Sequence, residues 1–199
     1  MFKKTIPILI CLTTLTGCIS LFPDPGPAPD YVHLNPDFSK HGSKSSAVQI
    51  IVEEPSADSM HNSTNIIVAN PPQQQKYKVA AGKEWFEKMP TFVQRDLVKA
   101  ISNKGVIGVE TSSKGIKADY VLLCNINKFL VSMANPEKPV VIIDADFSLV
   151  QAQGRKIVAK HSFVSSQESE EGFDNILKSF DYLYSDMLDD VSDWVINWK

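Results

Sequence analysis

The chain carries three cysteines among its 199 residues, and a cysteine thiol has the strongest intrinsic covalent chemistry of any side chain present. An ionised thiol can act as a nucleophile or as a metal ligand, provided that it is exposed and has a cationic neighbour. Cys124 lies inside the apolar stretch 120–126, which predicts a buried thiol of the core. Cys11 and Cys18 lie near the start of the chain, where the surrounding residues predict a different chemistry.

Cys18 ends the tetrapeptide Leu15-Thr16-Gly17-Cys18, which has the form of a lipobox, the processing signal of bacterial lipoproteins. Lys3 and Lys4 supply a positive start, and the apolar run 5–15 that follows is too short to span a bilayer. The pattern predicts a signal peptide over residues 1–17 and cleavage before Cys18. The Cys18 thiol then receives diacylglycerol, and its new amino group an acyl chain. An ordinary secretory signal with a chance cysteine is the alternative.

Three acyl chains would hold the protein stably on a membrane, because two or more chains suffice. The residue after the cysteine is Ile19, not the Asp that retains lipoproteins in the inner membrane, so we expect the outer membrane, facing the periplasm. Residues 18–46 include the proline-rich stretch 22–30 and predict an extended tether. Residues 47–199 are long enough for one periplasmic domain with a core.

No other group of residues predicts chemistry. None of the four histidines (His33, His41, His61 and His161) has metal-ligand spacing with another histidine or with Cys124. No phosphate-binding or nucleophile motif is present, and a net charge of −3 argues against nucleic acid as a partner. We therefore expect no catalytic residue, no metal, no cofactor beyond the acyl chains, and no enzyme activity. Asp144 and Asp146 share one side of a strand, as a solvated face or as a carboxylate pair for a basic partner.

Alternating and helical patterns predict a single α/β domain, a mixed-sheet layer with two helices packed on one face. The order of elements is β-β-α-β-β-β-β-α. A long antiparallel hairpin is expected over 140–164. The first helical pattern covers 85–103, with a break at Pro90 and the regular helix starting after it, so that Thr91 lies near its first turn. The remaining expected strands are 48–52, 66–68, 106–110 and 119–133, with a further short strand possible at 76–79.

The last segment, 170–198, has apolar residues spaced alternately by four and three, which predicts a long helix. The stripe fits a helix laid across the sheet, and it also fits a seam with another subunit. The aspartates of this segment lie mostly off the stripe and are expected to face solvent. The residues that we expect at a partner interface are Tyr184, Val191, Trp194 and Trp198.

Residues 77–105 read YKVAAGKEWFEKMPTFVQRDLVKAISNKG, with a tryptophan before a proline-linked helix that ends at glycine. This stretch, together with the lipobox, the hairpin and the terminal helix, resembles the ABC-type transport auxiliary lipoproteins. These accompany MCE-type lipid transporters, including those of the paraquat-inducible type. The resemblance implies an outer-membrane adaptor for an MCE-type transporter subunit, and a homo-oligomer. A structural or assembly lipoprotein of a cell-wall synthase or secretion channel stays open as the alternative, and an envelope hydrolase as a third.

Overall fold

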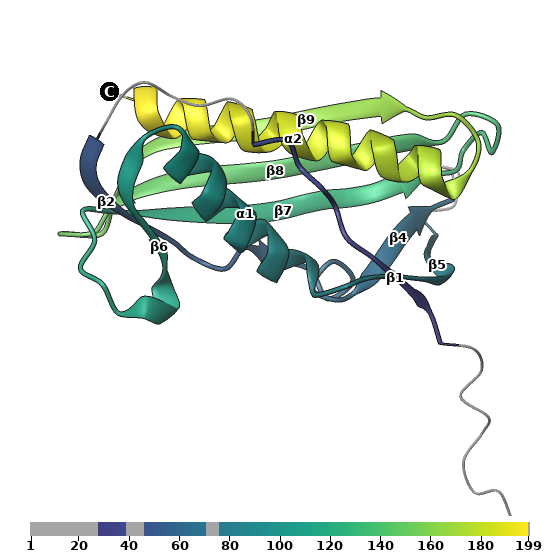
Figure 1. Ribbon diagram of the computed structural model, residues 1–199, viewed down its shortest axis with the longest axis horizontal. Coiled ribbons are helices and arrows are strands. Elements are labelled where there is room, and N and C mark those ends of the chain that lie inside the picture. Colours follow the sequence, from purple (N-terminus) through teal and green to yellow (C-terminus); the bar gives the residue numbers. More distant parts are fainter. Residues whose placement is uncertain (1–27, 39–45, 71–75, 199) are drawn as a thin grey trace, which may run out of the picture.

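A computed structural model of the chain describes residues 28–38, 46–70 and 76–198. The predicted signal peptide, the lipobox residues Leu15, Thr16 and Gly17, and Cys18 lie outside these described residues. The described part holds one sheet of nine strands, with two long helices on one of its faces (Figure 1). Neither helix is long and apolar enough to cross a membrane, as far as the described residues show.

The centre of the sheet is the long strand β7 (Tyr120–Ser132). One edge of β7 pairs antiparallel with β8 (Val140–Gln151), and β8 pairs in turn with β9 (Lys156–Glu168). Valine, isoleucine and phenylalanine alternate with polar residues along β8, which suits a strand with one buried side. The predicted hairpin over 140–164 is thus confirmed.

The other edge of β7 pairs in succession with three short parallel strands: β2 (Ser46–Val52), β3 (Ser56–Ala57) and β4 (Asn65–Ala69). Farther out, β6 (Val106–Thr111) pairs with β2, and β5 (Tyr77–Trp85) pairs with β4. The three-residue strand β1 (Asp30–Val32) completes this side against β5, and a short 3-10 helix follows β6 at Ser112–Lys114. Because two strand pairs share one edge of β7, the sheet forks there.

The helices are α1 (Met89–Asn103) and α2 (Phe173–Asn197). Both lie in front of the sheet in Figure 1, which confirms the predicted α/β class with two helices on one face. The helical pattern predicted from Trp85 is wrong for its first residues, because Trp85 ends β5 and α1 begins four residues later, close to the start that was predicted for the regular helix. Pro90 occupies the first turn of α1, where a missing backbone N–H costs nothing, so it starts the helix without breaking it.

The core lies between the sheet and the helices and centres on aromatic rings. Trp85 is 1% exposed and makes edge-to-face contacts with Phe92, Phe129 and Phe180, at centroid distances of 5.5–6.0 Å. Tyr184 adds further edge-to-face contacts with Phe92 and Phe129. Such pairs add about 0.5–1.5 kcal/mol each beyond the area they bury. The cluster therefore locks β5, β7 and both helices together.

The segment after β1 crosses the two helices on the side away from the sheet. Leu34 is 8% exposed and belongs to the core, while the backbone N–H groups of Asn35 and Asp37 donate to Asp181 and Ser185 of α2. Asn103 of α1 donates to the carbonyl of Phe38. The prediction that residues 18–46 form a tether is therefore wrong for 30–38, because these residues pair with the sheet and pack on the helices.

Candidate interaction surfaces

The sequence predicted a partner interface on the apolar stripe of α2. In the structure, the central residues of this stripe are buried inside the domain. Tyr184 and Val191 are both 0% exposed and pack into the core between α2 and the sheet. Their predicted interface role is therefore wrong in this fold, because their surface is already covered by the chain's own strands. The central part of the stripe is the surface by which α2 packs on the sheet, so it is not an interface with another subunit.

Trp194 and Trp198, near the end of α2, are partly buried and each contacts a strand. The ring of Trp194 stacks on His161 of β9 with centroids 5.2 Å apart, and Trp198 makes an edge-to-face contact with Tyr120 of β7. His161 Nε2 also lies 2.5 Å from Asp190 Oδ2. These two tryptophans therefore fasten the last turns of the helix, while part of each ring stays at the surface.

Not all the aspartates of α2 simply face solvent, because several form ion pairs with residues of neighbouring elements. Lys104, just after α1, contacts Asp189 and Asp193 at 2.6 and 2.8 Å. Burial works to lower the pKa of Lys104, but the hydrogen bonds that it donates to the two carboxylates outweigh this effect and raise the pKa above its ordinary value. The expectation of a purely solvated acidic face is thus corrected, because these acids tie α2 to α1 and to β9.

A thiol in contact with an imidazole could act as a nucleophile with its base, but the structure separates Cys124 from His161. Phe147 pairs with Cys124 on one side and with His161 on the other, so a full strand lies between the two side chains. Burial raises the pKa of the Cys124 thiol far above its ordinary range, and Cys124 is 5% exposed. A buried, protonated thiol is a poor nucleophile, and Cys124 packs in the hydrophobic core.

The face of the sheet away from the helices carries a hydrogen-bonded polar network across four strands. Asn127 Nδ2 of β7 donates to Asp144 Oδ1 (3.0 Å) and to Asp146 Oδ2 (2.8 Å), both on β8. Asn125 Nδ2 donates to Asn127 Oδ1 at 2.6 Å, and Ser162 Oγ of β9 donates to Asp146 Oδ1 at 2.6 Å. At the other end, Ser56 Oγ of β3 donates to Asn125 Oδ1. We call these six residues the open-face network.

The open-face network combines fixed geometry with negative charge. Hydrogen bonds from Ser162 and Asn127 lower the pKa of Asp146, so its carboxylate stays ionised at neutral pH. Lys128 Nζ lies 3.7 Å from Asp144 Oδ2 and offsets part of the charge. Leu123 and Val164 are exposed by 41% and 69% on the same face. Ordered carboxylates beside exposed apolar groups suit recognition of a protein surface with basic and apolar groups.

The two asparagines of this network were missed at the level of sequence, although the pair Asp144 and Asp146 was noted as a possible site for a basic partner. Asn125 and Asn127 alternate with the buried residues Cys124 and Ile126 along β7. That period of two was the available signal for a polar outer face. Only the pairing of β7 with β8 brings the amides within reach of the carboxylates.

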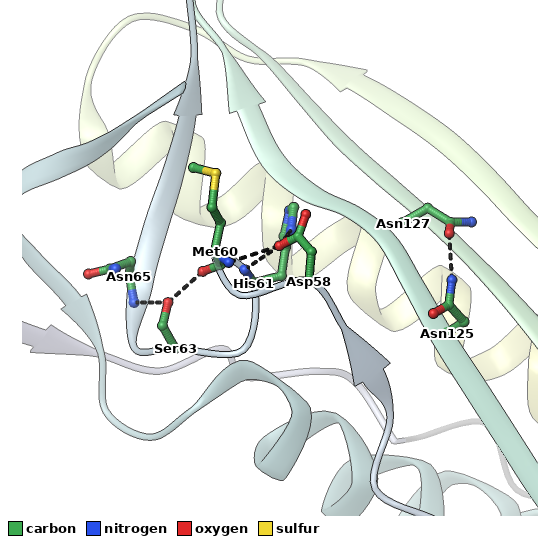
Figure 2. Close-up of polar contacts among 7 residues, drawn as sticks. All are labelled: Asp58, Met60, His61, Ser63, Asn65, Asn125 and Asn127. Atoms are coloured by element: carbon green, nitrogen blue, oxygen red, sulfur yellow. Dashed lines mark hydrogen bonds and ion pairs between the residues drawn. The ribbon is translucent and has the colours of Figure 1, made fainter. Parts of the chain in front are cut away.

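Beside β7, the loop between β3 and β4 is held by one carboxylate, as Figure 2 shows. Asp58 Oδ1 accepts from the backbone N–H groups of Met60 and His61 and lies 2.9 Å from His61 Nδ1. The backbone N–H of His61 is the main cause of the lowered pKa of Asp58. His61 is 5% exposed, and its Nε2 has no hydrogen-bond partner among the described residues. The loop is thus held by contacts of one carboxylate with two backbone N–H groups and one ring nitrogen.

Comparison with solved structures supports this fold. A crystal structure of a Xanthomonas campestris protein superposes with a TM-score of 0.68 at 19% sequence identity, covering 84% of this chain and 92% of that one. A second crystal structure, of an uncharacterized protein, gives a TM-score of 0.66 at 13% identity, covering 85% of this chain and 99% of the other. At these identities the likeness establishes the fold alone. No match was found among curated proteins.

Comparison with family models adds a match over residues 34–192, to the model described as the ABC-type transport auxiliary lipoprotein component. The matched range begins at Leu34, the first buried residue of the segment that crosses the helices, and ends at Ser192 within α2. It thus spans every strand except β1, the whole of α1 and most of α2, which is well over half of the chain. The chain belongs to the family of ABC-type transport auxiliary lipoprotein components.

Proposed function

We propose that this protein is an outer-membrane lipoprotein that faces the periplasm and serves as the adaptor subunit of an MCE-type intermembrane lipid transporter. The observation that carries the proposal is the family match over residues 34–192, since that family consists of accessory lipoproteins of ABC-type transport. The adaptor binds partners and catalyses no reaction. Its separation of Cys124 from His161 supports this non-enzymatic role.

The anchor of the proposed adaptor is Cys18, acylated on its thiol and on its amino group after cleavage behind Gly17. The lipobox Leu15-Thr16-Gly17-Cys18 supports this step. Each methylene buried in the bilayer contributes about 0.8 kcal/mol, so three acyl chains hold the domain for long periods. The intact mass of protein purified from membranes tests the anchor. A mature chain that begins at residue 18 and carries three acyl groups is expected, whereas an unmodified mass would reject it.

The docking surface of the proposed adaptor is the open face of the sheet. The open-face network and the exposed side chains of Leu123 and Val164 support it, because they give this face both charge and apolar area. We further propose that the protein is a homo-oligomer. The long strand β9 supports this, since it pairs only with β8 among the described residues and leaves its other edge available.

The experiment is a pulldown of the lipidated protein from native membranes, with its partners identified by mass spectrometry. An MCE-type subunit is expected to copurify, and the double variant Asp144→Lys/Asp146→Lys is expected to lose it by more than about tenfold. Asp174→Lys/Asp186→Lys changes the charge equally on the exposed side of α2 and serves as the matched control. Recovery of a cell-wall synthase or secretin in place of the transporter subunit would reject the proposal.

A further inference from the structure

The outer side of β9 presents backbone groups with which no other strand pairs. β9 lies beyond β8 at one edge of the sheet (Figure 1), and among the described residues it has β8 as its only neighbouring strand. From residue 160 to residue 168 it holds neither a proline nor a bulge, which are devices that commonly keep edge strands from pairing. A long regular edge of this kind suits the addition of another strand.

The register with β8 shows which backbone groups of β9 face outward. Val140 pairs with Glu168, and the N–H of Ser169 donates to the carbonyl of Pro139 at 2.8 Å, one step beyond that pair. Val140 and Glu168 therefore form a non-hydrogen-bonded pair, in which the N–H and C=O of Glu168 point away from β8. The Glu168 carbonyl accepts from the side chain of Gln167. The register stays regular back to residue 160, so every second residue has the same orientation. We call these residues the β9 edge: Lys160, Ser162, Val164, Ser166 and Glu168.

The side chains of the β9 edge share the open face of the sheet. Phe163 is buried in the core and Val164 beside it is 69% exposed, so the even-numbered side chains from 160 to 168 point away from the helices. Lys160 and Glu168 are exposed at the two ends, with Val164 midway between them. Glu168 also binds Lys138 at 2.9 Å, and both of these side chains are more than half exposed. The β9 edge thus carries a cation, a central apolar residue and an anion in line.

An antiparallel copy of β9 is complementary to this edge when Val164 lies opposite itself. A two-fold axis at Val164 places Lys160 opposite Glu168 of the second copy, and the reverse. Ser162 then lies opposite Ser166 of the second copy. All five outward-facing residues meet a counterpart, and each directly opposite pair exchanges two N–H···O=C bonds. Moving the axis by two residues would set Val164 opposite Lys160 or Glu168, so this register alone matches charge with charge.

The helices on the other side of the joined sheet have room to pack. Because α2 packs on both β8 and β9, the axis would place the second α2 about two strand spacings away, which is about 10 Å. Packed helices lie about 8–10 Å apart. Each α2 carries six aspartates, but Lys104 binds Asp189 and Asp193, and His161 binds Asp190. These contacts within each subunit offset part of the repulsion between two acidic helices.

We propose that the β9 edge binds the β9 edge of a second copy of this chain, antiparallel and about a two-fold axis at Val164. The inference rests on the homo-oligomer of the proposed function and adds the strand, the direction and the register that join two copies. The product is one continuous sheet through β7, β8 and β9 of both copies. Both open faces lie on the same side of it, so a partner docking there meets two open-face networks related by one axis.

Disulfide crosslinking of the lipidated mature protein in native membranes tests the register. In Val164→Cys the two introduced thiols belong to a hydrogen-bonded pair with Cα atoms about 5.5 Å apart, within disulfide range. Most of this variant is expected to crosslink on mild oxidation, and Cys124, at 5% exposed, does not compete. Ser166→Cys is the matched control on the same strand, because its two copies lie four residues apart, about 13 Å. Crosslinking of both variants, or of neither, overturns the inference.

Charge exchange tests the pairing independently, by analytical ultracentrifugation of the lipidated protein in detergent. Lys160→Glu and Glu168→Lys should each raise the dissociation constant of the dimer by at least about tenfold, because each sets like charges opposite one another twice. Lys160→Glu/Glu168→Lys should restore the wild-type constant, since opposite charges face each other again. Val164→Lys should also separate the copies, whereas Val79→Lys, at a valine 52% exposed on β5, should not. A double variant as weak as either single variant contradicts this pairing.

The same preparations separate this inference from the proposed function. A monomeric wild-type protein that still captures the MCE-type subunit from membranes rejects only the pairing of β9 edges. A dimer crosslinked at Val164 that captures no such subunit rejects the proposed adaptor and supports the pairing.

Discussion

At the scale of single residues, the hydroxyl of Tyr184 donates a 3.1 Å hydrogen bond to Asp96 Oδ2, with both side chains buried. Burial is the main cause of the strongly raised pKa of Tyr184, so the phenol stays protonated and remains a donor. Asp96 also accepts from Arg95, which keeps its charge compensated. Tyr184 is therefore a structural residue that links α2 to α1.

Replacing Tyr184 by phenylalanine keeps the ring contacts and removes this single hydrogen bond. We expect Tyr184→Phe to lower the free energy of unfolding by about 1–3 kcal/mol, because a buried carboxylate loses one of its donors. Chemical denaturation measures the change. Tyr182→Phe is the matched control, since Tyr182 is 63% exposed, and it should change stability by less than about 0.5 kcal/mol. Equal effects of the two variants would contradict the buried hydrogen bond.

Asp58 makes the stability of the β3–β4 loop depend on pH. Its folded-state pKa is lowered from the ordinary value of 3.8, chiefly by the backbone N–H of His61. Its contribution is therefore complete above pH 3.8 and is lost as the pH falls through the lowered folded-state pKa. Asp58→Asn keeps an acceptor at this site but does not titrate. The stability difference between wild type and Asp58→Asn should shrink as the pH is lowered from about 5 to about 2. Parallel pH profiles in urea denaturation would contradict this account.

At the scale of elements, the turn between β8 and β9 depends on a left-handed backbone. Gly154 has φ of +81° and Arg155 has φ of +50°. A side chain at Gly154 meets no atoms within 4 Å, so the cost of Gly154→Ala is purely conformational. We expect a loss of about 1–2 kcal/mol in the free energy of unfolding. Gln153→Ala, at the exposed neighbour, should stay within about 0.5 kcal/mol. A neutral Gly154→Ala would show that the turn relaxes to another conformation.

Contacts at several points fix the position of α2 relative to α1 and to β9. Ion pairs of Lys104 with Asp189 and Asp193 hold α2 against α1, and Trp194 with Asp190 holds it against His161 of β9. Because α1 packs on β6 and β2 and α2 packs on β8 and β9, the two helices together cover one face of the sheet. The opposite face of β7, β8 and β9 carries no helix in the described part of the chain, and it is the face that we propose for docking.

At the scale of the whole molecule, the segment 30–38 connects the proposed anchor to the domain, and Leu34 holds it in the core. Leu34→Ala should release this segment, because a buried leucine contributes about 2–5 kcal/mol. Amide hydrogen exchange over β1 and residues 33–38 is expected to rise by more than about tenfold, the equivalent of 1.4 kcal/mol. His33→Ala changes an exposed neighbour and should leave exchange unchanged. Unchanged exchange in Leu34→Ala would mean that the segment is held by other contacts.

Release of this segment would also lengthen the tether between membrane and domain. The proposed geometry has about ten residues between Cys18 and the domain, whereas a tether ending at residue 46 would allow much larger distances. A short tether keeps the domain close to the bilayer and limits its rotation. In the proposed geometry, the contacts that stabilise residues 30–38 thus set how far the open face stands from the membrane.

Local patterns in the sequence determined the element types, because each depends on a period that neighbouring residues display. The alternation in 140–149 predicted β8, and the spacing by four and three in 173–198 predicted α2. The helical pattern was extended too far, to Trp85, because Trp85 is buried at the end of β5 and its apolar side chain continues the apolar pattern of α1. The extra strand β1 was not predictable, since three residues show no period and owe their strand form to pairing with β5.

The lipobox is likewise a property of sequence alone, because a processing enzyme reads an extended peptide and needs no fold. The covered face of α2 and the open face of the sheet were decided by tertiary structure. An apolar stripe on a helix predicts that this side of the helix is buried. It does not tell whether the chain's own sheet or a second subunit buries it. Burial of Tyr184 and Val191 by the sheet settled that choice. The open-face network likewise needs β7 beside β8, a pairing between residues distant in the chain that no local pattern specifies.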